Sequence, residues 1–107
     1  YVDYKFITPW MALNQKNAIK YEKFNDIEKG ELLKQVLIGN ILSLAKGLNY
    51  TVEEKIYVWI DLEEISVNFK NIKMKAFKGK FRTNCVIPNY LGIGKSVARG
   101  FGTVKGG

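Results

Sequence analysis

One broad apolar stripe constrains the fold of this chain more than any other feature. From Glu31 to Lys46, apolar side chains recur at the i, i+3 and i+4 spacing of one helix face, and their neighbours widen that face: Leu32, Leu33, Val36, Leu37, Ile38, Ile41, Leu42 and Leu44. Lys46 and the glycine after it form a helix stop signal. A helix this apolar must be largely buried, so the rest of the chain has to supply a surface for it. A chain of 107 residues is long enough for one such core and too short for two.

The segments around this helix have the composition of strands. Aromatic and β-branched residues gather in four of them, separated by turn residues. These segments are Tyr1–Thr8, Glu54–Leu62, residues 65–86 with breaks at Lys70-Asn71 and Gly79, and Phe101–Val104. We expect Pro9 to end the first strand and Glu63-Glu64 to form the turn after the second. A short helix over Gln15–Phe24, capped by Asn14, follows the first strand.

The order of these elements predicts the fold class. It is strand, helix, strand, strand, glycine-rich crossover and strand, with the short helix preceding the long one. This is the α+β, ferredoxin-like βαββ(α)β arrangement over residues 1–107, with an antiparallel sheet. The glycine-rich loop replaces or shortens the second helix. The buried face of the long helix is expected to lie on the sheet.

The positive charge of the chain is concentrated in its second part. The net charge is +7, yet residues 1–64 carry eight lysines and ten acids, whereas residues 65–107 carry nine basic residues and no acid. Such a block is typical of a surface that binds a polyanion. The candidate phosphate-binding residues on the third strand are Lys73, Lys75, Lys78, Lys80 and Arg82. The alternative is a solvated lysine-rich surface without a ligand.

A glycine-rich segment near the end of the chain is the second candidate site. Its paired glycines and the polar residues between them are Gly92, Gly94, Lys95, Ser96, Arg99, Gly100 and Gly102. Glycines allow close backbone approach and positive φ, so several N–H groups can point at one anion. The alternative is a flexible connector between two strands. A P-loop would need glycine where Asn89 stands, and a dinucleotide-binding loop would need glycine where Val97 stands, so we reject both.

Residues for catalysis and for metal binding are scarce. The chain has no histidine, which excludes a histidine base, a triad and an imidazole metal site within it. Its single cysteine, Cys85, excludes an internal disulfide and fits a reducing, cytoplasmic compartment. We therefore expect no metal, no cofactor and no membrane segment. Because the chain starts in an apparent strand without a methionine, we also expect it to be a fragment of a longer protein.

Residues 79–105, with Gly100-Phe101-Gly102 at the entry to the last strand, resemble the C-terminal signature of the CRISPR-associated repeat-RNA endoribonucleases of the RAMP superfamily. Residues 6–14 and 37–43 are similar to the C-terminal domain of the b-type subfamily. The resemblance implies the second half of a two-domain protein for antiviral defence, in which each half is ferredoxin-like. It also implies metal-independent cleavage of CRISPR repeat RNA by a histidine in the N-terminal half, so this chain alone is not expected to be catalytic.

The resemblance also implies partners. The glycine-rich segment matches the part of the family that contacts RNA, either a repeat hairpin or a single strand. The short helix then packs on the missing N-terminal half or on a second copy in a homodimer. The alternative function is a non-catalytic RAMP-type RNA-binding subunit of a CRISPR interference complex. An RRM-type RNA binder is disfavoured because Lys80-Phe81-Arg82 does not fit the aromatic motif of that fold.

Overall fold

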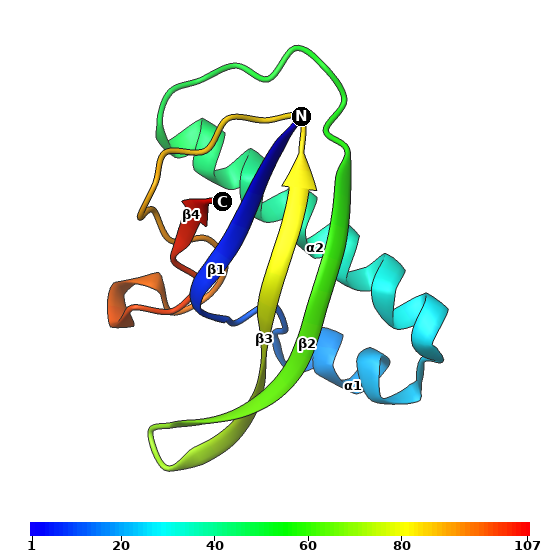
Figure 1. The fold of residues 1–107 in the computed structure, drawn as a ribbon. Helices are drawn as coiled ribbons and strands as arrows, with labels where there is room; N and C mark the ends of the chain where they lie inside the picture. The colour runs from blue at the N-terminus through cyan, green and yellow to red at the C-terminus, as the bar shows by residue number, and fades with distance from the viewer.

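The computed structural model describes all residues from Tyr1 to Gly107. Its elements are β1 (Val2–Trp10), α1 (Gln15–Lys23), α2 (Asp26–Gly47), β2 (Val58–Phe69), β3 (Ile72–Thr83), the 3-10 turn η1 (Val97–Arg99) and β4 (Val104–Gly106). The four strands form an antiparallel sheet in the order β2-β3-β1-β4, and both helices lie on one face of it (Figure 1). The α+β, ferredoxin-like prediction is confirmed, since η1 is all that remains of the second helix.

The helices begin at asparagine caps. Asn14 accepts from the N–H of Asn17 at 2.7 Å, as predicted for α1. However, α2 begins at Asp26 and not at Glu31, because Asn25 and Glu28 form a capping box in a polar first turn. An apolar stripe cannot reveal a polar turn. The prediction that the helix is largely buried is also too broad, since Leu42 is 46% exposed while Leu37 is fully buried. No helix of the structure is both long enough and apolar enough to cross a membrane.

The β2–β3 hairpin is longer than predicted. Glu63 and Glu64 do not form a turn but lie inside β2, where they pair with residues of β3. The reversal occurs at Lys70-Asn71, whose φ angles of 52° and 64° are those of a type I′ turn. The prediction of a break at Lys70-Asn71 therefore marked the hairpin turn itself.

The first strand also continues beyond the predicted stop. Pro9 lies within β1, in an irregular stretch between Phe6 and Trp10 where the register with β3 shifts. Proline is tolerated at such a bulge because no ladder N–H is required there. The bulge predicted at Gly79 is therefore found opposite it, in β1, since Gly79 pairs with Phe6 and keeps its register with β2.

Aromatic side chains form the core between the sheet and the helices. Trp10 is fully buried, stacks on Phe6 at a centroid distance of 5.3 Å and packs against Phe77. Its indole N–H donates to Oδ1 of Asn40 on α2 at 2.9 Å. This hydrogen bond satisfies the one polar atom that Trp10 brings into the core. Trp10 therefore joins the end of β1 to the middle of α2.

Candidate nucleic-acid interface

The five basic residues predicted on β3 lie on two faces of the sheet. Side chains alternate along a strand, so Lys78, Lys80 and Arg82 point to the face that no helix covers, which we call the open face. Lys73 and Lys75 have the opposite parity and belong to the helix-covered side. The structure therefore brings these five residues onto one strand without making them one surface.

Lys75 is held by a network within the protein. Its ammonium forms ion pairs with Glu22 of α1 and Glu64 of β2, and lies 5.4 Å from the centre of the Tyr21 ring. The Tyr21 hydroxyl donates to Oε1 of Glu64 at 2.7 Å, and burial together with Glu64 raises the pKa of that hydroxyl. Lys29 covers the Tyr21 ring at 4.8 Å. This network ties α1 to the hairpin and leaves Lys75 least available to a ligand.

Acidic residues from β1 and β2 lie beside the basic residues of β3, although the sequence after Glu64 contains no acid. Arg82 donates from Nε to Oδ1 of Asp3 at 2.7 Å, and this hydrogen bond lowers the pKa of the Asp3 carboxyl. Lys78 pairs in register with Glu63 of β2. Lys80 pairs in register with Asp61 of the same strand. The neighbouring strands thus supply a carboxylate beside each of the three open-face cations of β3, which weakens the potential that the sequence block predicts.

Three of the four loop glycines are required by packing within the protein. At Gly94 an added Cβ would lie 2.6 Å from Nε1 of Trp10, and at Gly92 it would lie 2.9 Å from the side chain of Val97. At Gly102 it would collide with the carbonyl oxygen of Ile93. Gly100 has a φ of 92° and open space around it. At Gly92, Gly94 and Gly102 the group that approaches closely belongs to the protein, whereas the sequence predicted the approach of a ligand.

Hydrogen bonds to the end of β1 hold the loop in place. The N–H of Lys95 donates to the Met11 carbonyl at 3.1 Å, and the N–H of Gly102 donates to the Pro9 carbonyl at 2.7 Å. These two hydrogen bonds tether both halves of the loop to the end of β1. The N–H groups of Ser96, Val97 and Ala98 donate to no protein acceptor, and the side chain of Lys95 is exposed.

The loop meets the tip of the β2–β3 hairpin. The Arg99 guanidinium lies 5.3 Å from the centre of the Phe69 ring, and Lys70 lies 5.5 Å from the same ring. Phe101 packs edge-on against Phe69 at 5.7 Å. We call Phe69, Lys70, Arg99 and Phe101 the hairpin–loop cluster. The sequence analysis missed Phe69 and Lys70, although the break at Lys70-Asn71 already placed them at a turn.

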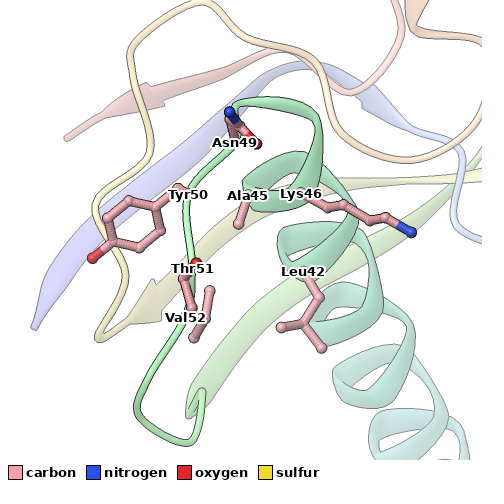
Figure 2. A pocket seen from close by; sticks show the side chains of 7 residues that line it. All are labelled: Leu42, Ala45, Lys46, Asn49, Tyr50, Thr51 and Val52. Atoms are coloured by element: carbon pink, nitrogen blue, oxygen red, sulfur yellow. The ribbon is translucent and has the colours of Figure 1, made fainter.

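Two surface hollows lie beside α2. One, of about 290 Å³, lies between the end of α2 and the segment after it and is lined by Leu42, Ala45, Lys46, Asn49, Tyr50, Thr51 and Val52 (Figure 2). It contains no carboxylate and no thiol. Another, of about 440 Å³, lies between the helices and β2. Its lining includes Asp26 and Asp61, as well as Tyr21 and Glu64, which bond to each other. No group of three or more histidine, cysteine, aspartate or glutamate residues is placed to hold a metal ion.

The fold defines the class of this protein as a ferredoxin-like α+β domain. Two features distinguish it within that class: a glycine-rich crossover with one 3-10 turn takes the place of the second helix, and the β2–β3 hairpin packs on that crossover. A model of the Cas6b C-terminal domain matches residues 1–106. The chain therefore belongs to the Cas6b C-terminal domain family, as the resemblance in its sequence implied.

Solved structures and a curated relative agree with this family. Two crystal structures, described as "CRISPR RNA processing endoribonuclease Cas6b" and "Cas6b", superpose with a TM-score of 0.97 at 55% identity, covering 99% of this chain. They are covered to 54% and 55%, so the chain spans about half their length. The uncharacterized protein MJ0978 of Methanocaldococcus jannaschii is 49% identical over 104 residues, which are 96% of this chain and 71% of that protein.

Proposed function

We propose that this domain binds CRISPR repeat RNA as the C-terminal part of a metal-independent endoribonuclease that processes precursor CRISPR RNA. The observation that carries the proposal is the TM-score of 0.97 at 55% identity to a protein described as a CRISPR RNA processing endoribonuclease. The length of that protein leaves room for a second half, which we propose to be the N-terminal ferredoxin-like domain. This match favours the nuclease over the non-catalytic subunit of an interference complex.

The RNA contacts are proposed to lie at the glycine-rich loop and the hairpin–loop cluster. The exposed ammonium of Lys95 and the unpaired N–H groups that follow it offer several donors to one phosphate. Arg99 and Lys70 add positive charge next to the Phe69 ring. Gly92, Gly94 and Gly102 act indirectly in this proposal, because they allow the loop shape that presents Lys95, Ser96 and Arg99.

The chemistry of cleavage is proposed to come from outside this chain. General acid–base catalysis by a positioned side chain is typically worth about 10² to 10⁴ in rate, and histidine is the most frequent group for it. The chain has none, and its perturbed tyrosine, Tyr21, has a raised pKa and a bond to Glu64 that make it a poor proton donor or base near neutral pH. In this proposal the domain grips the RNA while another domain cuts it.

Lys95→Ala tests the proposal most cleanly, because the Lys95 side chain is exposed and makes no ion pair. We expect weaker binding to a repeat-RNA hairpin with an unchanged melting temperature. Arg99→Ala is a poorer choice, since it also removes the contact with Phe69. Lys16→Ala, on the exposed side of α1, is the matched control for loss of one charge. Equal affinities of the Lys95 and Lys16 variants would remove the loop from the interface.

A further inference from the structure

The sheet has one edge that the chain covers and one that it leaves free. At β4, the Tyr90 N–H donates to the Val104 carbonyl, and the Val104 N–H donates to the Leu91 carbonyl, so the preceding loop covers this edge. β2 is the other edge strand (Figure 1). Its twelve residues form backbone hydrogen bonds with β3 and with no other segment. A long, free edge strand is a template on which a further strand can pair.

The alternation of hydrogen bonds identifies the backbone groups of β2 that point outwards. The N–H of Ile7 donates to the Thr103 carbonyl, so the odd-numbered residues of β1 bond to β4 and the even-numbered ones bond to β3. Carried across β3, the same alternation directs the odd-numbered residues of β2 to β3, and the Asp61 carbonyl does point towards Gly79 of β3. The outward N–H and C=O groups, which no hydrogen bond uses, include those of Ile60, Leu62 and Glu64.

This stretch of the β2 edge forms one wall of a groove, and the helices form the other. The groove is the hollow of about 440 Å³ between the helices and β2. Leu33 of α2 contributes apolar surface from one side, and Ile60 and Leu62 contribute it from the other. An extended segment in the groove can therefore bond to the edge and place every second side chain on apolar surface.

The groove is acidic, although the domain as a whole has a net charge of +7. Three carboxylates line it, from Asp26, Asp61 and Glu64, and Lys29 is its one basic residue. Neither Asp26 nor Asp61 forms an ion pair, and the Lys29 ammonium lies over the Tyr21 ring at 4.8 Å. Such a surface attracts cationic side chains and repels the phosphates of RNA.

The charge of β2 also disfavours a second copy of this chain as the occupant. Two β2 strands that pair around a two-fold axis present the same residues to each other. Each would bring Asp61, Glu63 and Glu64 and no basic residue. Like charges opposite each other destabilise a sheet, whereas a basic strand brings the opposite charge.

We propose that an extended basic segment of a partner protein binds in this groove as a fifth, antiparallel strand beside β2. Its backbone bonds to Ile60, Leu62 and Glu64, and the residues directly opposite Ile60 and Leu62 are apolar. Because side chains alternate along a strand, the residue opposite Asp61 is lysine or arginine. The groove thus selects a segment in which apolar and basic residues alternate. This interaction goes beyond the proposed function and does not depend on it.

Amide hydrogen exchange in the full natural chain tests this proposal. The probe is a heptapeptide with blocked ends in which lysine and valine alternate. The amides of Ile60, Leu62 and Glu64 should exchange rapidly in the free protein and become about 10-fold more protected at a peptide concentration of about ten times the Kd. Those of Asp61 and Glu63, which bond to β3, should be protected in both states. Unchanged exchange with the peptide would overturn the proposal. Protection of the outward amides before the peptide is added would also overturn it, since the rest of the protein or a second copy would then cover the edge.

Variants of the peptide separate backbone pairing from charge. The valine amides face β2 in the proposed register, so their N-methylation should lower the affinity about tenfold or more, whereas N-methylation of the lysine amides should lower it less. A peptide with glutamate in place of lysine should not bind. Equal affinities of these peptides would refute strand pairing selected by charge.

Variants of the protein locate the site. Asp61→Asn should weaken binding of the lysine–valine peptide about 2- to 5-fold, as for one exposed ion pair. Glu53→Gln, which removes an exposed carboxylate outside the groove, should leave binding unchanged. Equal effects of the two substitutions would place the peptide elsewhere and overturn the proposal. Displacement of the peptide by a repeat-RNA hairpin would assign the groove to RNA, and the inference would fail while the proposed function stands.

Discussion

Replacing Gly94 by alanine should destabilise the domain through one defined contact. The new Cβ would lie 2.6 Å from Nε1 of Trp10 and 3.1 Å from the Met11 carbonyl, and the residue would keep a φ of 91°. Trp10 is fully buried and its indole N–H is bonded to Asn40, so the ring has little freedom to move. The left-handed backbone alone costs an alanine roughly 1–2 kcal/mol. Overpacking of a close-packed core adds about 1–3 kcal/mol.

Gly100→Ala is the matched control for this prediction. Gly100 has nearly the same φ, 92°, but nothing lies within 4 Å of an added Cβ. Its alanine variant should therefore lose only the roughly 1–2 kcal/mol of the backbone term. The assay is urea unfolding of both variants, with the free energy of unfolding compared at equal slopes. Equal losses in the two variants would refute the argument that Gly94 is required by its approach to Trp10.

Three further predictions concern the ion network, the salt dependence and the chemistry. The pKa of Tyr21 is higher in the folded than in the unfolded protein, so the contribution of Tyr21 to stability should be complete below about pH 10 and disappear as the pH rises further. Tyr21→Phe should lower the free energy of unfolding by about 1 kcal/mol at pH 8, measured by urea unfolding, and should abolish that pH dependence. Affinity for a repeat hairpin should fall steeply with salt, by about one unit of slope for each phosphate contact, and a flat response would contradict the electrostatic argument. The isolated chain should not cleave repeat RNA in a gel assay, and specific cleavage without added metal would show that a residue other than histidine does the chemistry.

Much of the fold could be predicted from the local spacing of apolar residues in the sequence. The stripe in α2 and the order of the strand-like segments were sufficient for the ferredoxin-like prediction, because each depends on spacing along the chain. The errors occurred where neighbours in space decide. Glu63-Glu64 resembles a turn, yet cross-strand pairing with Lys78 and Phe77 keeps it in β2. Pro9 resembles a strand end, yet a bulge accommodates it.

Less of the candidate site could be predicted from the sequence, because the site too depends on neighbours in space. The composition after Glu64 identified a basic block, but not the carboxylates of Asp3 and Glu63 that neighbouring strands bring beside it. The glycine spacing identified the loop, but not that Trp10, far away in sequence, requires Gly94. Lys5 lies outside the basic block and comes to lie between Lys80 and Lys105 only through sheet register. Register is set by long-range pairing, which no local window contains.

The position of β4 against β1 has a consequence for synthesis. The loop that carries Lys95 is fixed at two places (Figure 1). It donates hydrogen bonds to the Met11 and Pro9 carbonyls at the end of β1, and it leads into β4, whose Gly106 pairs with Tyr4 of β1. Its anchor in β4 is synthesised some hundred residues after its anchor in β1. Until β4 docks, the basic loop has only one fixed end. A chain truncated before β4 should therefore expose the positive charge of the loop without its fixed shape, and the RNA contact that we propose for the loop should require β4 to be in place.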